Sequence, residues 1–219
     1  MAARFGATSD TLDAEGSIVQ LDAPMPDEHE IQAALESFTG DLLQTPPMAS
    51  AIKVGGERLY SLHRKGISVE RESRPVTVHA LELTSVDPAA QNTSFEISCG
   101  SGTYVRSLIS DLAASLGTGA YLTALRRTSV GHLTLESAMT PDELTSENLY
   151  KCIIQSGDVV AHLPWLEVGS EEREGICNGR PIFPCERLGT FVVGCGEELL
   201  AIYHGDGTEA RAEVVLCGG

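Results

Sequence analysis

The sequence predicts an α+β fold, with a mixed or antiparallel sheet domain over residues 1–157 and a small β-barrel domain over residues 162–219. Three observations support this. Through the first part of the chain, apolar residues recur at helical spacing in some segments and alternate in others. After Gly157, short apolar runs separated by Gly, Pro and Asn follow at intervals of roughly ten residues, as in small barrels. The length of 219 residues suffices for one well-packed domain and a small second one.

The first third of the chain predicts a strand and two helices. Residues 18–21 have the composition of a short strand. A helix is expected to begin with Pro26 at its first position and to end at Gly40. A shorter helix is expected over 59–64, before Gly66. The longer helix has an apolar stripe at i, i+3, i+4 and i+7, formed by Ile31, Ala34, Leu35 and Phe38.

The middle of the chain predicts two adjacent antiparallel strands followed by a helix. Residues 74–86 and 95–97 have strand composition, and a polar turn separates them at 87–94. An amphipathic helix is expected over 105–116, closed by Gly117.

The remaining elements are shorter. A strand is expected over 121–130. Thr140 and Glu143 form a capping-box pattern with Pro141 at the first helical position, and helical structure is expected to reach about Gln155. The apolar runs of the tail are 191–193, 199–203 and 212–216.

Composition excludes several classes of protein. The chain has no run of eighteen apolar residues and no apolar core at its start, so neither a membrane helix nor a signal peptide is expected. Its six cysteines form no C-x-x-C pair, and without an export signal we expect reduced thiols rather than a disulfide framework. The histidines lack zinc-ligand spacing, so no metal is expected. The expected location is the cytoplasm.

Charge is unevenly distributed along the chain. The formal net charge is −16, which would repel nucleic acid if it were spread evenly. Residues 53–127, however, hold nine of the fifteen Lys and Arg against seven acidic residues. This stretch is either an ordinary mixed surface or a basic face suited to phosphate contacts, and composition does not decide between the two.

Common cofactor and hydrolase motifs are missing. Gly100 and Gly102 lie between a predicted strand and a predicted helix, but Val105 occupies the place of the third glycine of a dinucleotide fingerprint. A P-loop and a G-x-S-x-G elbow are also lacking.

Tyr104 and Arg106 form the most informative pair. Residues two apart point the same way in an extended stretch, whereas on a helix they diverge. Their place at a strand-to-helix junction therefore favours one common hollow. The alternative is a tyrosine in the core and an arginine paired with surface carboxylates.

Three segments, in this order, resemble the TruB-type family of tRNA pseudouridine synthases. The first comprises Arg4-Phe5-Gly6 and residues 10–16. The second comprises 46–48, 50–53, Gly56, Tyr60, Gly66 and 74–78. The third comprises 102–106, Asp111-Leu112, Leu116-Gly117, Gly119-Ala120 and 125–127. The tail more loosely resembles the RNA-binding PUA-type domain that follows in this family, so the expected barrel is PUA-like.

The resemblance implies isomerisation of a uridine at position 55, in the T arm of tRNA, without cofactor or metal. It implies catalytic roles for Tyr104, which would stack on the flipped base and assist proton handling, and for Arg106, which would pair with the nucleophilic aspartate. Substrate-binding roles fall to Asp13 at the pocket edge, to Leu125 in its lining, and to phosphate contacts by Lys53, Arg126 and Arg127. The expected partner is tRNA, with no membrane and no metal, and the chain is expected to act as a monomer.

The chain departs from the family pattern in two places. The family's nucleophile lies in a G-x-L-D motif upstream of the segment that opens this chain, so the catalytic domain is expected to lack its N-terminal part. Asp13 imitates that motif, but its neighbours match the second acidic segment, so it is not expected to be the nucleophile. Ala49 stands where the family often has tyrosine. Three interpretations remain open: a truncated start of a genuine synthase, a non-catalytic tRNA-binding remnant, and a fragment that decayed or that a partner chain completes.

Overall fold

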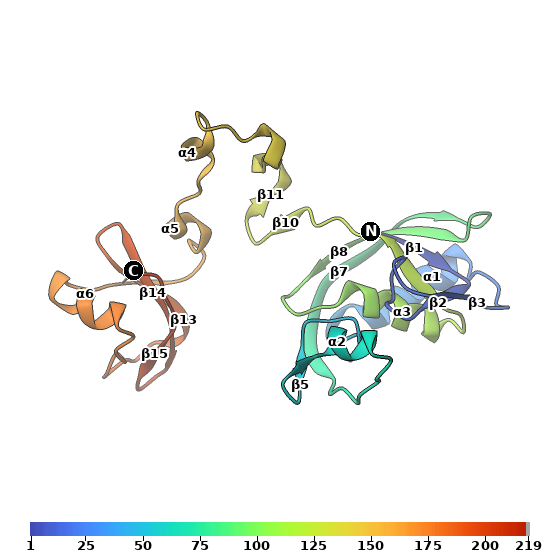
Figure 1. The fold of residues 1–219 in the computed structure, drawn as a ribbon, viewed down its shortest axis with the longest axis horizontal. Coiled ribbons are helices and arrows are strands. Elements are labelled where there is room, and N and C mark those ends of the chain that lie inside the picture. Colours follow the sequence, from blue (N-terminus) through green and yellow to red (C-terminus); the bar gives the residue numbers. More distant parts are fainter. Residues whose placement is uncertain (218–219) are drawn as a thin grey trace. The chain divides into compact units, whose positions relative to one another are not determined.

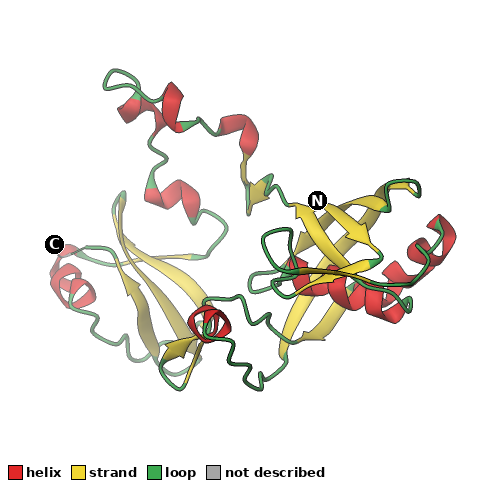
Figure 2. Ribbon diagram, turned by 45° about the vertical axis from the view of Figure 1, so that its right-hand side comes forward, coloured by secondary structure: helices red, strands yellow, loops and turns green. Residues whose placement is uncertain are grey.

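The computed structural model describes residues 1–217, which divide into two compact units (Figures 1 and 2). The first unit comprises residues 1–126 and the second begins at Arg127. Within the described residues, no helix combines the length and the apolar character that crossing a membrane requires.

The first unit is built on a five-stranded sheet in which every neighbouring pair is antiparallel, in the order β4-β7-β8-β1-β9. The long β7–β8 hairpin confirms the predicted strand pair, with pairing that includes Leu81 opposite Ile97 and Leu83 opposite Phe95. The strands are β1 (Ala2–Phe5), β4 (Gly40–Gln44), β7 (Arg74–Asp87), β8 (Asn92–Cys99) and β9 (Ala120–Ala124).

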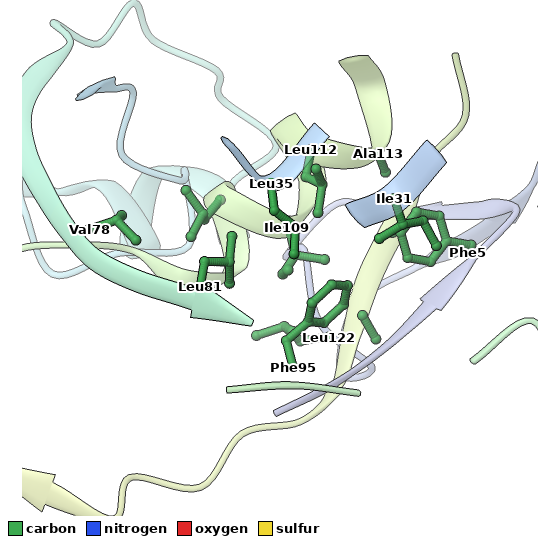
Figure 3. Packing of buried hydrophobic residues seen from close by; sticks show 13 residues of the cluster. Phe5, Ile31, Leu35, Val78, Leu81, Phe95, Ile109, Leu112, Ala113 and Leu122 are labelled. Carbon is green, nitrogen blue, oxygen red and sulfur yellow. The ribbon is translucent and has the colours of Figure 1, made fainter. Parts of the chain in front are cut away.

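Two helices, α1 (Glu28–Leu35) and α3 (Val105–Ser115), bury their apolar sides in the core of this unit. In Figure 3, Ile31 and Leu35 of α1 and Ile109 and Leu112 of α3 point toward the strand residues Phe5, Leu81, Phe95 and Leu122. Burying one large aliphatic side chain contributes about 1.5–3 kcal/mol, so this cluster fixes where α3 lies on the sheet.

The start of α1 differs from the prediction. We expected Pro26 at the first helical position, but the helix begins at Glu28 because Asp27 caps it. The Asp27 carboxylate accepts a hydrogen bond from the Glu30 amide at 2.8 Å, and the Glu30 carboxylate accepts one from the Asp27 amide at 2.8 Å. This reciprocal capping gives both amides a partner at the helix end, where the helix itself supplies none. A 3₁₀ turn at Glu36–Phe38 extends the helix.

Short elements lie around this sheet. The predicted strand at 18–21 is β3 (Ile18–Gln20), which pairs with β2 (Ala7–Ser9). A small hairpin, β5 (Lys53–Val54) and β6 (Glu57–Arg58), leads into α2 (Leu59–Arg64), which confirms the predicted short helix. The predicted strand over 121–130 is wrong at residues 125–128, where the chain leaves the sheet and its side chains are exposed; Ser129–Val130 form a separate short strand.

The second unit contains an open four-stranded sheet. Its order is β12-β13-β14-β15, with a parallel β12–β13 pair and antiparallel pairs elsewhere. Within the described part of the chain the sheet does not close, so the predicted PUA-like barrel is not confirmed. The elements are β12 (Trp165–Glu167), α6 (Ser170–Cys177), β13 (Leu188–Cys195), β14 (Glu198–Asp206) and β15 (Ala210–Val215).

Short pieces precede this sheet in the second unit. The Thr140–Glu143 capping box is present as predicted, although it starts a 3₁₀ turn at Pro141–Glu143. The other pieces are β10 (Ser129–Val130), β11 (Leu133–Thr134), a 3₁₀ turn at Leu135–Ser137, α4 (Leu149–Cys152) and α5 (Ser156–Val159).

One disulfide overturns the expectation that all cysteines are reduced thiols. Cys177, at the end of α6, is bonded to Cys217, after β15, with Cα atoms 5.2 Å apart. The fold brings together two residues that are 40 positions apart in the sequence, and no C-x-x-C pattern could have indicated this. Cys99, Cys152, Cys185 and Cys195 are free, as expected.

We predict that Cys177→Ser lowers the unfolding free energy of the second unit by about 2–4 kcal/mol, because the bond closes a long loop in the unfolded chain. Thermal unfolding of the full chain under oxidising conditions measures the loss. Cys152→Ser, which changes a free cysteine of α4, is the matched control. Equal stability of the two variants would contradict a formed disulfide.

Candidate active site

A tight turn over residues 9–16 presents the carboxylate of Asp13. Leu12 has φ of 64°, a left-handed conformation that costs a non-glycine residue about 1–2 kcal/mol. The turn is held against β9, where the Leu122 amide donates to the Leu12 carbonyl at 3.0 Å. The Asp13 carboxylate accepts hydrogen bonds from the Thr11 hydroxyl at 2.6 Å and the Glu15 amide at 3.1 Å. The backbone of the turn and these hydrogen bonds thus fix the orientation of the Asp13 carboxylate.

Gly16 makes this turn possible. A Cβ at this position would collide with the side-chain oxygens of Ser9, Asp10 and Thr11. The glycine that follows Asp13-Ala14-Glu15 is therefore required by close packing inside the turn.

Arg106 joins three segments of the first unit. Its Nη1 donates to the Asp13 Oδ2 at 2.7 Å and to the Thr11 carbonyl at 3.0 Å, and its Nη2 donates to the Ala49 carbonyl at 2.8 Å. Both side chains of the ion pair are 25% exposed. The pair is thus screened from bulk water while still bordering an open space.

The surroundings of Asp13 keep it ionised. Burial raises the pKa of its carboxyl, but the hydrogen bonds from Thr11, Glu15 and Arg106 and the charge of Arg106 together lower that pKa below its ordinary value. Asp13 is therefore a carboxylate at neutral pH and a permanent partner for the guanidinium.

A hollow of about 500 Å³ lies beside this ion pair, within the size range of small-ligand sites. Its walls come from the Asp13 turn, from the segment around Ala49, from α2 and from β9 with the residues after it. The lining residues are Thr11, Asp13, Ala14, Glu15, Ala49, Tyr60, Arg106, Leu122, Thr123, Ala124 and Leu125. Acidic, basic, aromatic and aliphatic side chains therefore meet in one space.

Tyr104 lies at a different place from the one expected. The helix α3 begins at Val105, so Tyr104 is its extended N-terminal cap residue while Arg106 is already helical. The argument from extended spacing does not hold there, and among the described residues the lining of the hollow includes Arg106 but not Tyr104. The role of Tyr104 in stacking and proton handling remains a prediction.

Gln44 fixes the start of α3, and the sequence reasoning missed it. Its side chain is 4% exposed. The Gln44 Nε2 donates to the Tyr104 carbonyl at 3.1 Å, and the Tyr104 amide donates to the Gln44 Oε1 at 2.7 Å. A buried amide side chain on β4 thus replaces the usual cap and sets the position of Arg106. The sequence offered only a polar residue after two leucines, Leu42 and Leu43.

The other predicted substrate-binding residues are spread over the two units. Leu125 is 57% exposed and lines the hollow. Lys53 on β5 and Arg126 are exposed residues of the first unit, and Arg127 begins the second. Among the described residues, none of the last three lines the hollow. No cluster of three or more His, Cys, Asp or Glu in the described part of the chain could hold a metal ion.

Two solved structures share this fold. The crystal structure of a Cbf5-Nop10-Gar1 complex superposes with a TM-score of 0.64 and 20% identity, over 99% of this chain and 65% of that one. The structure of an H/ACA RNP bound to a substrate RNA containing 2'-deoxyuridine gives 0.61 and 18%, over 99% and 65%. At these identities the likeness concerns the fold.

Sequence comparison gives the family. The model of the TruB family pseudouridylate synthase N-terminal domain matches residues 1–105, and that of the tRNA pseudouridylate synthase B C-terminal domain matches residues 106–156. The chain belongs to the TruB family of pseudouridine synthases.

Curated relatives carry the name tRNA pseudouridine synthase B. The protein from Mycobacteroides abscessus is 37% identical over 97% of this chain and 73% of its own length. The protein from Actinobacillus pleuropneumoniae is 39% identical over 83% and 61%, and that from Burkholderia mallei is 48% identical over 64% and 46%. The chain thus spans from about half to three quarters of the length of these relatives.

We predict that Asp13→Asn destabilises the chain by about 1–2 kcal/mol at pH 7, because the charge-assisted bonds to Arg106 are weakened. The folded-state pKa of Asp13 lies below its unfolded value, so the stabilisation is present above about pH 4 and is lost as the pH falls through the folded value. Denaturant unfolding at pH 7 and pH 3 measures the unfolding free energy of both proteins. The difference between variant and wild type should be smaller at pH 3 than at pH 7. Asp22→Asn, at an exposed position, is the control. A difference in unfolding free energy between Asp13→Asn and wild type that does not change with pH would contradict the role of the carboxylate.

We predict that Gln44→Ala costs about 1–3 kcal/mol, because it leaves the Tyr104 amide without its acceptor, whereas the Tyr104 carbonyl keeps the bond from the Leu108 amide. Hydrogen exchange should show faster exchange at the Tyr104 amide and the first turn of α3. Gln20→Ala, an exposed glutamine of β3, is the matched control. Unchanged protection at Tyr104 would show that Gln44 does not position the helix.

Proposed function

We propose that this chain supplies the RNA-binding and arginine-bearing part of an active site that isomerises uridine 55, in the T arm of tRNA, to pseudouridine. The observation that carries the proposal is the position of Arg106. Its guanidinium lies inside a segment that resembles the TruB family, is held by Asp13, Thr11 and Ala49, and borders a hollow of about 500 Å³.

The chemistry requires a hollow of this kind. The bond from the ribose to the uracil N1 breaks, a new bond forms from the ribose to C5 of the same base, C5 loses its proton to solvent and N1 takes one up, so the product is an isomer of the substrate. The base must leave the stack to be reached, which costs a few kcal/mol, and it needs a pocket that receives it. In the hollow, Arg106 offers a fixed cation that would keep a nearby nucleophilic carboxylate ionised.

We further propose that the 219-residue chain alone is inactive. The printed sequence contains no G-x-L-D motif, in which the family carries its nucleophile. Asp13 already accepts bonds from Thr11, Glu15 and Arg106, and it serves in this proposal as the residue that positions Arg106. Loss of a nucleophile that acts as part of a unit cost about 10⁶ in kcat in a protease.

The remaining residues have supporting roles in the proposal. Leu125 borders the base through its exposed side chain, and Tyr104 assists the proton transfer. Lys53, Arg126 and Arg127 contact phosphates, which orient the RNA without reading its sequence. The same proposal includes three further points. The second unit is a PUA-like RNA-binding domain, the chain acts as a monomer, and it acts in the cytoplasm.

A second candidate function is tRNA binding without catalysis. The surplus of basic residues in 53–74, where six Lys and Arg accompany three acidic residues, favours it. It predicts salt-sensitive binding of T-arm RNA and no isomerisation in any context.

We predict that the chain alone binds a T-arm hairpin at low salt but forms no pseudouridine above background. A chimera that adds the preceding part of the Mycobacteroides abscessus relative to this chain should regain turnover, because that part restores the nucleophile to Arg106. Tritium release from a 5-tritiated uridine substrate measures turnover by the chain and by the chimera, and fluorescence anisotropy measures binding. An anticodon-arm hairpin is the control for the T-arm site.

The outcomes separate the alternatives. An active chimera that loses activity with Arg106→Ala supports the proposal. An inactive chimera that still binds RNA favours the non-catalytic candidate. Turnover by the chain alone would overturn its proposed inactivity, and lack of RNA binding at low salt would overturn both functions.

A further inference from the structure

We infer that a second hollow of the first unit holds a ribonucleotide next to the target uridine and recognises its 2′-hydroxyl through His63 and Asp10. The inference rests on the proposed function and adds a recognition site outside the hollow beside Arg106. It follows from the place of the second hollow, from the polar groups that face it and from the distance between them.

The second hollow has a volume of about 290 Å³ and adjoins the first, because three segments of the chain line both. Each segment contributes one residue to each hollow, and the two residues are at most three positions apart in the sequence. The pairs, with the residue of the second hollow first, are Asp10 and Asp13, Met48 and Ala49, and His63 and Tyr60. An RNA whose target base enters the first hollow would therefore bring an adjoining nucleotide to the second.

His63 and Asp10 present polar atoms to each other at the wall of this hollow. The His63 Nε2 and the Asp10 Oδ2 are 3.8 Å apart, which is too far for a direct hydrogen bond. The other carboxylate oxygen, Oδ1, accepts a bond from the Ser17 amide at 2.8 Å. Within residues 1–217, neither Oδ2 nor Nε2 has a hydrogen-bond partner. One carboxylate oxygen and one ring nitrogen are thus available to a ligand.

A hydroxyl group fits between these two atoms. It can donate to the carboxylate and accept from an N–H of the ring at the same time, with its oxygen about 2.8 Å from each. A carbonyl could bond only to the ring, and a phosphate would be repelled by the carboxylate. In an RNA chain each nucleotide carries a free 2′-hydroxyl, which is the group that lets a protein distinguish RNA from DNA.

The loop after α2 completes the hollow. Met48 and Ile67 supply apolar surface for the sugar and base of a nucleotide. The Gly66 amide donates to the His63 carbonyl at 2.9 Å, and this bond closes the helix end. The Ile67 amide donates to the Leu62 carbonyl at 3.0 Å. The backbone that carries the ring and the apolar wall is therefore fixed before RNA arrives.

An ordinary surface ion pair is the alternative for His63 and Asp10. Their side chains are 22% and 48% exposed, and ion pairs at such positions contribute little to stability. The Arg106–Asp13 pair differs, since its atoms are 2.7 Å apart and bonded directly. An ion pair without a ligand would make RNA binding independent of the sugar, and this difference can be measured.

The test is a double-mutant cycle between His63 and the 2′-hydroxyl. The wild-type chain and His63→Phe, which keeps a flat ring without N–H groups, are titrated by fluorescence anisotropy with a labelled T-arm hairpin. Further hairpins carry a single 2′-deoxynucleotide at one of the positions next to the target uridine. For the wild type, one of these hairpins should bind about 10-fold more weakly, because the hydroxyl that bonds to the carboxylate is missing.

His63→Phe should bind the intact hairpin about 5-fold more weakly than the wild type, because it loses the bond from the ring. It should bind the sensitive deoxy hairpin within about 2-fold of the wild type, since the partner of the ring is already missing. His29→Phe, at an exposed histidine of α1, is the matched control and should bind every hairpin like the wild type.

A hairpin with a 2′-fluoro nucleotide at the sensitive position separates recognition from sugar shape. Fluorine keeps the ribose-like pucker but cannot donate to Asp10, so the wild type should lose affinity for this hairpin as well. A loss confined to the deoxy hairpin would overturn the inference.

Two further results would overturn it. One is a wild type that binds the T-arm hairpin but is insensitive to every sugar change, which leaves the proposed function intact. The other is an equal loss by His63→Phe with all hairpins, which would assign His63 a structural role. If the wild type binds no hairpin at low salt, the proposed function fails first and the inference falls with it.

Discussion

The guanidinium of Arg106 connects separate segments of the first unit beside the hollow. Its three bonds reach the carboxylate of Asp13, the carbonyl of Thr11 and the carbonyl of Ala49, which belong to segments far apart in the sequence. Arginine suits this position because its planar fork presents several donors in a rigid arrangement and stays charged at every relevant pH. Lysine could not make all three contacts at once.

The other features of the site depend on this arrangement. The left-handed turn at Leu12 and the close packing at Gly16 orient Asp13 and the Thr11 carbonyl toward the same cation. Gln44 sets the first turn of α3, from which Arg106 extends. His63 of α2 lies 3.8 Å from Asp10, which brings the helix that carries Tyr60 close to the same turn. The walls of the hollow are thus positioned by polar contacts, while the apolar core fixes the sheet and helices behind them.

The net negative charge of the chain agrees with the proposed RNA binding only if charges close to the hollow are considered. The chain carries a formal net charge of −16, yet the hollow contains a paired arginine and lies beside a segment with more basic than acidic residues. Long-range repulsion of RNA by the whole molecule is screened within about 8–10 Å at physiological salt. The proposed RNA binding would therefore depend on close contacts, for which the hollow offers an aromatic ring, aliphatic side chains and one fixed ion pair.

The sequence alone determined the family and several of the helices and strands. Periodicity predicted the β7–β8 hairpin, α2 and α3 because local apolar spacing reflects which side of each element meets the core. Three ordered segments indicated the TruB family, which the comparisons confirm. Only the tertiary structure decided that Asp13 is the partner of Arg106, that Gln44 caps α3, that Tyr60 rather than Tyr104 borders the hollow, and that Cys177 meets Cys217. The three pairwise contacts join residues 40 to 93 positions apart, and the place of Tyr104 depends on where a helix begins; no local pattern encodes either.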